Sequence, residues 1–532
     1  MLNVAPPTYI DATETRLVEA ISAWRRALGD GPVLTETERY NVDTSSFAGR
    51  IPVALRPASV GQVQQIVKVA QRFSIPIYPI STGHNWGYGT SVPVRSPCAI
   101  VDLSAMNKII AFDRELGVVT LEPGVTQGAL SEYLHSRGLP FLVPVTGAGP
   151  SCSIIANALE RGFGVTPITD HFAAVISMKV VLPDGGIYES YTRTFDAAGV
   201  AQAFKWGTGP YLDGLFSQSN LGIVVDASIA LQPRTERSGA LFFVLDTNQQ
   251  VDEATERIRE LLAGAGHNIG AINVMSRSRV ECMLSGSRKV LRGRSVSMPG
   301  GAWFGFGSIY GCKEHYRATC RLVKRCLRGH VRQIRIYTSE DIRRLRWISA
   351  FAAAVGRPRL TGLVDRLEAA LNIVDGIPST FALPLAYAKS GRANDQTDLN
   401  PAHDGCGLFW YAPIVPLRRG IVGKFIEFAE RTCRKHGVVA AMTLTTLSAR
   451  CYASTIPLLF DRMDPDAERH ARMCFEELYE EGLTLGFVPY RIGSQFMPAL
   501  AHHGARVGPL VQTVKSALDP TLVLAPGRYS FD

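Results

Sequence analysis

The chain of 532 residues lacks the short signatures of several common enzyme classes. It has no P-loop, no H-E-x-x-H and no G-x-S-x-G, so the usual phosphate-binding loop and the commonest zinc and serine hydrolase sites are not indicated. Its ten cysteines form no C-x-x-C pair and no Cys/His cluster at zinc spacing. We therefore expect no metal, no disulfide framework, and cysteines that are mostly buried thiols.

Long apolar runs are also missing from the sequence. No run approaches the roughly 18 residues that a membrane-spanning helix needs. The stretch MLNVAPPTYIDATETR lacks the basic region and the apolar segment of a signal peptide. These absences predict a cytoplasmic protein that does not bind a membrane.

Charged residues are sparse, at 19% of the chain, and a net charge of +9 is too dilute for a nucleic-acid-binding protein. Arginine is dense only between Arg288 and Arg346. This segment fits a solvated helix face, or alternatively a docking surface for an acidic partner.

Hydrophobic residues, in contrast, make up 46% of the chain, which is enough for a large core in an α+β fold. In residues 1–235, short apolar runs alternate with helical patterns, such as the helix expected behind Ser59 and the strand IPIYPI after it. Residues 236–484 carry strand-like runs (ALFFVLD, GAWFGFGSIYG, GLFWYAPIV, VVAAMTL) between charged amphipathic helices. That alternation is typical of an antiparallel sheet covered by helices. Residues 485–532 form a tail that we expect to return to the first section.

Two glycine-rich loops are the first candidates for chemistry. STGHNWGYG (residues 81–89) follows a predicted strand and offers successive backbone N–H donors, as in a nest that binds pyrophosphate. TGAGPSCSIIANALERGFG (residues 146–164) places small residues around a short helix. Small residues there allow either a cofactor to lie on the backbone or the helix to pack closely. Spacing alone leaves both interpretations open.

These loops occur together with other motifs in a fixed order: EPGVT (122–126), NALERGFGVTPITDH (157–171), FKWGTGPYLDGLFSQSNLGIV (204–224), PYR (489–491) and LAPGR (524–528). The set resembles the vanillyl-alcohol oxidase and p-cresol methylhydroxylase family of FAD-dependent oxidoreductases over nearly the whole chain. The resemblance implies a two-domain PCMH-type fold. Residues 1–235 and 485–532 would form the FAD-binding domain, and residues 236–484 the cap, or substrate, domain.

The resemblance also implies FAD as the cofactor, bound largely through backbone groups. The positions that match the family's FAD contacts are Ser81, Thr82, Gly83, His84, Asn85, Gly147, Gly149, Ser153, Asn157, Gly162, Gly164, Gly222, Ile223 and Arg528. The positive charge of Arg528, placed near the flavin, would stabilise the anionic reduced form of the cofactor.

Four further residues match the family's catalytic positions. Tyr88, Tyr490 and Arg491 correspond to the residues that bind a para-substituted phenol as its phenolate. Two hydroxyl donors and one permanent charge stabilise such an anion strongly in a dry pocket. Asp170 corresponds to the acidic residue near the flavin in the alcohol-oxidase branch, where it would act as a base. The alternative for Asp170 is a cap for the FAAV stretch that follows.

The sequence departs from the family at several places. Leu408 stands where the oxidase branch has its flavin-linked histidine, and Ala453 and Ser454 replace a His-His pair near the substrate. The loss of the His-His pair indicates a substrate that is either bulkier than a simple cresol or of another kind. His84, however, occupies the position of the flavin-linked histidine in berberine-bridge-type relatives. We therefore predict an 8α-histidyl bond from His84 to FAD, with a hydrogen bond to FAD as the alternative.

The sequence thus predicts an FAD-dependent oxidoreductase that takes a hydride from the benzylic carbon of a para-substituted phenol or aromatic alcohol. The partners would be a small aromatic substrate and an electron acceptor, either O2 or a cytochrome c, and we expect a homo-oligomer. The alternatives are an oxidase of a non-phenolic alcohol of berberine-bridge or alditol-oxidase type, the flavin subunit of a cytochrome-linked electron-transfer complex, and a non-catalytic flavoprotein.

Overall fold

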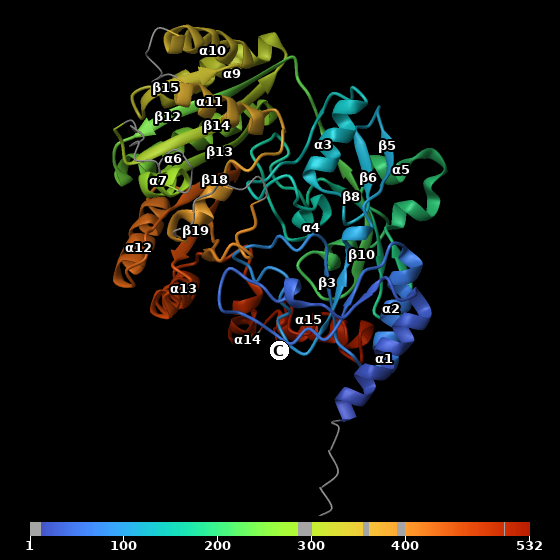
Figure 1. The fold of residues 1–532 in the computed structure, drawn as a ribbon. Helices are drawn as coiled ribbons and strands as arrows, with labels where there is room; N and C mark the ends of the chain where they lie inside the picture. Colours follow the sequence, from blue (N-terminus) through green and yellow to red (C-terminus); the bar gives the residue numbers. More distant parts are fainter. Residues whose placement is uncertain (1–11, 286–299, 355–360, 391–398, 505, 532) are drawn as a thin grey trace, which may run out of the picture.

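Helices and strands are mixed throughout the protein, which is described here from a computed structural model covering residues 12–285, 300–354, 361–390, 399–504 and 506–531 (Figure 1). The elements up to residue 233 are α1 (Ala12–Leu28), β1 (Val33–Leu34), β2 (Ala54–Leu55), α2 (Val60–Phe73), β3 (Ile77–Ile80), β4 (Ala99–Asp102), β5 (Ile109–Asp113), β6 (Val118–Leu121), α3 (Gln127–Ser136), β7 (Phe141–Leu142), α4 (Ile154–Leu159), β8 (Val175–Val181), β9 (Ile187–Glu189), α5 (Val200–Ala203), β10 (Ile223–Ala230) and β11 (Gln232–Pro233).

The remaining elements are β12 (Arg237–Leu245), α6 (Asn248–Ala265), β13 (Ile269–Ser276), α7 (Arg277–Ser285), β14 (Trp303–Gly311), α9 (Lys313–Leu327), β15 (Arg332–Tyr337), α10 (Ser339–Ala354), α11 (Thr361–Val374), β16 (Gly407–Tyr411), β17 (Ile414–Pro416), α12 (Ile421–Lys435), β18 (Thr443–Ser448), β19 (Cys451–Phe460), α13 (Pro465–Thr484), α14 (Leu500–His503) and α15 (Gly508–Leu518). No helix among the described residues is long and apolar enough to cross a membrane.

The first strands form two small sheets. One has the order β1-β2-β4-β3, with β4 parallel to both β2 and β3, and the other is antiparallel with the order β5-β6-β10-β8-β9. Helix α2 begins as predicted at Ser59, whose Oγ accepts a hydrogen bond from Gln62 N at 3.4 Å. It buries one apolar face against β3 and β4 and ends at Ser74, which has a left-handed φ of 53°. The loop after β3 therefore begins at a strand end that packing against α2 holds in place.

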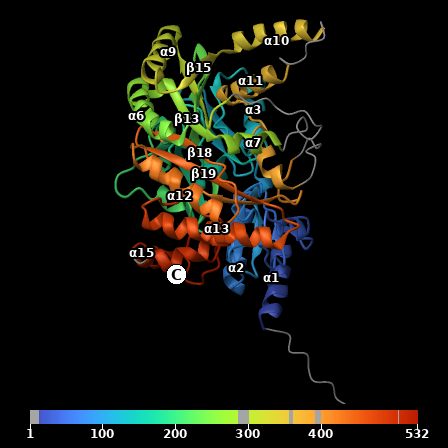
Figure 2. The ribbon, with the colours of Figure 1, turned by 90° about the vertical axis from the view of Figure 1, so that its left-hand side faces the viewer.

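The predicted antiparallel sheet covered by helices is confirmed in β12 to β19. This eight-stranded sheet has the order β15-β12-β14-β13-β18-β19-β16, with β17 paired to β19. Successive side chains of β12 point to opposite faces of the sheet, so they pack into two different hydrophobic cores. Leu241, Phe243 and Leu245 lie in a core with side chains of α6, α9, α12 and α13, whereas Ala240 and Phe242 pack with side chains of α11. Figure 2 shows α12 and α13 on their face of the sheet.

Two predicted strands of this sheet differ in detail. The run VVAAMTL forms a strand only from Thr443 onward, because the N–H groups of Ala441 and Met442 donate to carbonyls two residues earlier and leave the ladder. The run GLFWYAPIV divides into β16 and β17 around Pro413, since proline has no N–H for the ladder.

The C-terminal residues lie against the first sheet. Ile77 N donates to Val523 O at 2.8 Å, and Ala525 N donates to Ile77 O at 2.7 Å. Lys515 Nζ, on α15, donates to Asn220 O at 2.7 Å. Both ribbon views place α15 at the same end of the molecule as α1 and α2 (Figures 1 and 2). From these sheet memberships we propose the division into residues 1–235, 236–484 and 485–532.

Candidate active site

The two glycine-rich loops meet at His84. Its Nδ1 lies 3.0 Å from Ser151 Oγ, and its ring stacks on Trp86 at 4.8 Å between ring centroids. Ser153 begins α4, because its Oγ accepts from Ala156 N at 3.1 Å and donates to Pro123 O at 2.6 Å. Residues from both predicted FAD-binding stretches are therefore neighbours in space.

A second group of predicted FAD contacts surrounds His171. Asn157 Nδ2 lies 2.6 Å from His171 Nδ1, and His171 N donates to Gly162 O at 3.1 Å. A Cβ on Gly162 would lie 1.9 Å from Asn157 Oδ1, and one on Gly164 would lie 2.9 Å from His171 Nε2. Glycine is thus required at both positions because the chain segments approach so closely.

His171 itself is buried, and burial lowers its pKa to about 4. Its ring is therefore neutral near pH 7. With Nδ1 accepting from the Asn157 amide, the ring proton sits on Nε2, which is buried and has no hydrogen-bond partner among the described residues.

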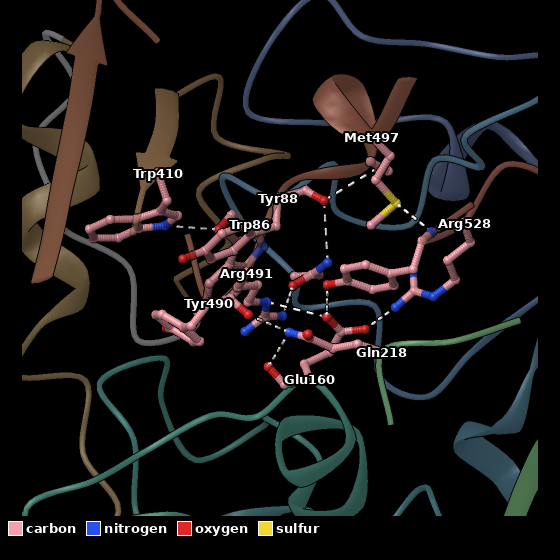
Figure 3. A network of polar contacts seen from close by, with 12 residues as sticks. Trp86, Tyr88, Glu160, Gln218, Trp410, Tyr490, Arg491, Met497 and Arg528 are labelled. Atoms are coloured by element: carbon pink, nitrogen blue, oxygen red, sulfur yellow. Dashed lines mark hydrogen bonds and ion pairs between the residues drawn. The ribbon is translucent and has the colours of Figure 1, made fainter. Parts of the chain in front are cut away.

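The predicted phenol-binding residues converge from two distant segments (Figure 3). Tyr490 N donates to Ala412 O at 3.0 Å, and Ser494 N donates to Tyr88 O at 3.0 Å, which brings the segment after α13 beside the loop after β3. The guanidinium carbon of Arg491 lies 4.3 Å from the centroid of the Tyr88 ring. The Tyr88 and Tyr490 side chains are hydrogen-bonded to each other.

The ionisation of both tyrosines is suppressed. Burial raises the pKa of Tyr88 well above its usual value and also raises the pKa of Tyr490, while the nearby charge of Arg491 acts in the opposite direction on both. The two phenols therefore remain protonated donors across the neutral range. Asn85 Oδ1 accepts from Arg491 Nη2, and Gln218 Nε2 donates to Tyr490 O at 2.9 Å, so the arginine and the backbone of the tyrosine are held in place.

Glu160 is a buried residue of this cluster that the sequence reasoning missed. Its Oε2 lies 3.3 Å from Arg491 Nε and accepts from the Tyr529 hydroxyl at 2.7 Å, while Oε1 pairs with Arg528 Nη2. Arg528 Nη1 also donates to the Tyr78 hydroxyl. Glu160 lies within the quoted motif NALERGFG, but one carboxylate among many carries no signal until its partners are known.

Asp170 shares a cavity of about 340 Å³ with Tyr490 and Phe163. Its Oδ1 accepts from the backbone N–H of Phe172 at 3.0 Å and of Ala173 at 3.1 Å, which is the arrangement expected of a cap. Asp170 is exposed, and Oδ1 has a local structural role, whereas Oδ2 has no hydrogen-bond donor among the described residues.

Comparisons with known proteins agree with this arrangement. Residues 51–190 match a family described as an FAD binding domain. A Chondromyces crocatus protein named 1'-carboxy-chondrochloren decarboxylase is 32% identical over 97% of each chain. The 4-cresol dehydrogenase (hydroxylating) flavoprotein subunit of Pseudomonas putida is 27% identical over 98% of this chain and 96% of its own. A crystal structure of p-cresol methylhydroxylase with substrate bound superposes with a TM-score of 0.85 at 27% identity over 98% of both chains.

The chain belongs to the PCMH-type family of FAD-linked oxidoreductases. The predicted family, fold class and FAD cofactor are therefore confirmed, and the protein is an FAD-dependent oxidoreductase. The roles of individual residues in this PCMH-type enzyme remain predictions.

The residues present fit FAD. Among the described residues, the backbone N–H groups of Thr82, Gly83 and Asn85 donate to no acceptor, and Gly83 has a φ of 71°. Free N–H groups in a turn of this kind suit a pyrophosphate. The buried, unpartnered Nε2 of His171 is a further donor in the same FAD-binding region. Gly222, like Gly162 and Gly164, is required by protein packing, because a Cβ there would lie 2.4 Å from Val180 Cγ1.

Strand β16 lies beside Tyr88 in this PCMH-type site. Trp410, on β16, donates through Nε1 to Trp86 O at 3.1 Å, and its ring lies 6.5 Å from that of Tyr88 (Figure 3). Leu408, Ala453 and Ser454 are buried in β16 and β19. No cluster of His, Cys, Asp or Glu side chains in the part of the chain that is described suits a metal ion.

Proposed function

We propose that this enzyme oxidises a para-substituted phenol at its benzylic carbon, with Tyr88, Tyr490 and Arg491 binding the phenolate oxygen. The observation that carries the proposal is the convergence of two protonated phenols and one guanidinium from segments about 400 residues apart in the sequence. Charge-assisted hydrogen bonds of this kind favour the anionic form of a bound phenol.

The chain's own groups would act on the substrate in a definite order. Arg491 and the two tyrosine hydroxyls lower the pKa of the bound phenol, because all of them stabilise the phenolate. The electron density of the phenolate then reaches the para carbon and favours departure of a benzylic hydrogen with its electron pair. FAD supplies the acceptor for that hydride. Glu160, paired with Arg491, is a positioning residue that fixes the guanidinium.

Asp170 would complete the site as a base. Its Oδ2, which has no described donor, would accept a proton from a water or from a substrate hydroxyl at the oxidised carbon. Its place in one cavity with Tyr490 supports this role. His84, Gly147, Gly149, Ser153, Asn157, Gly162, Gly164 and Arg528 are the proposed FAD contacts, together with Ser81–Asn85, Gly222 and Ile223.

The electrons would pass to O2 or to a partner protein. The naming of the Pseudomonas putida relative as a flavoprotein subunit supports an electron-transfer partner, and we propose a cytochrome c for that role. An Arg-rich surface on α9, α10 and β15 would suit an acidic partner of this kind. A cytoplasmic location and a homo-oligomeric state stay predictions.

A second candidate, oxidative decarboxylation, is favoured by the 32% identity to a decarboxylase over 97% of both chains. The phenol would carry a carboxylate on the carbon next to the benzylic one. After the hydride leaves, the bond to the carboxylate breaks, its electron pair forms the side-chain double bond, and the ring returns to a phenolate as CO2 is released. Release of CO2 together with a vinylphenol product would distinguish this reaction from hydroxylation.

The test compares 4-ethylphenol with its O-methyl ether as substrates of the FAD-loaded enzyme. The phenol should be oxidised and the ether should not, because only the phenol forms an anion. Tyr88→Phe should lower kcat/KM by about 100-fold, as does the loss of one oxyanion donor elsewhere. The matched control is Tyr191→Phe, at an exposed tyrosine. Equal rates with the ether, or full activity of Tyr88→Phe, would overturn the proposal.

A further inference from the structure

Arg279 is a buried arginine that none of the roles above uses. It lies in the first turn of α7, and only 9% of the residue is exposed. Its Nε and Nη1 atoms are buried and have no hydrogen-bond partner among the described residues. Most buried arginines are paired with a carboxylate, because an unpaired buried charge is strongly unfavourable.

Among the residues that the structure describes, no carboxylate is paired with Arg279. Burial lowers its pKa to about 10, and the described groups whose charge acts on it are the Cys282 thiol and the Tyr88 phenol. The nearest glutamate along the helix, Glu281, instead lies 3.7 Å from Arg277. Even with the lowered pKa, Arg279 remains protonated at pH 7, so its positive charge has no ionic partner in this part of the chain.

Arg279 lies next to the proposed substrate site. Its guanidinium carbon is 5.2 Å from the centroid of the Trp410 ring, and the same ring is stacked with Tyr88 at 6.5 Å. Trp410 therefore contacts both the proposed phenol-binding tyrosine and the unpaired guanidinium. Arg279 and Tyr88 also interact electrostatically, so a ligand bound at Tyr88 would lie close to this positive charge.

We propose that Arg279 binds a carboxylate carried by the para side chain of the phenol substrate. This inference rests on the proposed function and narrows it to phenols with an anionic side chain, such as a 3-(4-hydroxyphenyl)propanoate unit. Arg491 would then bind the phenolate end of the substrate, and Arg279 would bind its carboxylate end. The guanidinium matches a carboxylate in geometry, with parallel N–H donors.

The experiment measures binding without turnover. The FAD-loaded enzyme is reduced anaerobically with dithionite, so that it cannot oxidise the ligand, and is titrated calorimetrically with 3-(4-hydroxyphenyl)propanoate and with the neutral propanamide. The wild-type protein should bind the acid about tenfold or more tightly than the amide, as expected for hydrogen bonds to a charged group. Arg279→Met should remove that preference while amide affinity stays the same, and Arg279→Lys should restore part of it.

The control for a general loss of positive charge is Arg317→Met, at an exposed position of α9, which should keep the full preference. Equal affinity of the wild-type protein for acid and amide would overturn the proposal, even if Arg279→Met fails to fold. An acid preference that survives in Arg279→Met would overturn it too.

Two further ligands separate this proposal from the proposed function. If 3-phenylpropanoate, which has no hydroxyl, binds as tightly as the phenolic acid and loses affinity in Arg279→Met, the carboxylate site stands and the phenol site fails. If 4-ethylphenol is oxidised but the acid binds no better than the amide, the phenol site stands and the role of Arg279 fails.

Discussion

The guanidinium of Arg491 lies 3.3 Å from the carboxylate of Glu160. The other oxygen of that carboxylate pairs with Arg528, so the arginine proposed for the phenolate and the arginine proposed for the flavin share one counter-ion. The three groups together carry one net positive charge. That balance holds both guanidinium groups in place and leaves positive potential for an anionic substrate and an anionic reduced flavin.

Replacing Glu160 with glutamine should therefore destabilise the protein and weaken the site. Two largely buried guanidinium groups would lose their counter-ion, a change that typically costs about 3 kcal/mol or more in the free energy of unfolding. The KM for the phenol should rise as Arg491 loses its orientation. Urea unfolding and steady-state kinetics measure the two effects. Glu314→Gln, at an exposed residue of α9, is the control, and an equal loss there would contradict the assignment.

Much of the fold could be predicted from the sequence because its local signals agree with the tertiary structure. The N-cap at Ser59 and the apolar face behind it define α2, and the amphipathic pattern of residues 248–265 defines α6. The strand predicted from residue 438 begins later than expected. Ala441 and Met442 are apolar and buried, as in a strand, but their N–H groups donate to nearby carbonyls of the same segment. Periodicity cannot distinguish buried turns from buried strands.

The candidate site was only partly predictable for a different reason. Tyr88, Tyr490 and Arg491 could be named because the motifs around them match a family in order. Glu160 and Arg279 could not, because their significance lies in burial and in the partners they have or lack. A sequence does not show which of its many glutamates and arginines are buried together.

Acid should destabilise the protein through His171. Its pKa is about 4 in the folded protein and 6.5 ordinarily, so the unfolded chain binds the extra proton between these values. The stability that comes from the neutral ring is fully present above pH 6.5 and is lost as the pH falls toward 4, by about 3 kcal/mol in all. His171→Gln should lose less stability between pH 7 and pH 5 in urea unfolding. His470→Gln, at an exposed histidine, should behave as the wild type; identical pH profiles for all three proteins would refute this account.

Asp170→Asn separates catalysis from capping. Asparagine keeps an Oδ1 acceptor for the N–H groups of Phe172 and Ala173, so the free energy of unfolding should change by less than about 0.5 kcal/mol. Turnover should nevertheless fall by about 100-fold if the carboxylate is the base. Asp184→Asn is the matched control, since Asp184 Oδ1 accepts from Gly186 N at 2.7 Å in a turn away from the site. Wild-type turnover in Asp170→Asn would leave Asp170 as a cap alone.

The predicted covalent bond between His84 and FAD has a direct test. The wild-type protein is precipitated with acid, and intact mass and the visible spectrum show whether flavin stays with the chain. Flavin should be retained by the wild type and by His403→Ala, at an exposed histidine, and released from His84→Ala. Ser151→Ala should slow the attachment. Ser151 Oγ lies 3.0 Å from His84 Nδ1, and this contact fixes the orientation of the ring and the position of its proton. Release of FAD from the wild type would show that His84 only forms a hydrogen bond to the flavin. Because Leu408 replaces the family's other flavin-linked histidine, FAD would then have no covalent bond at position 84 or at position 408.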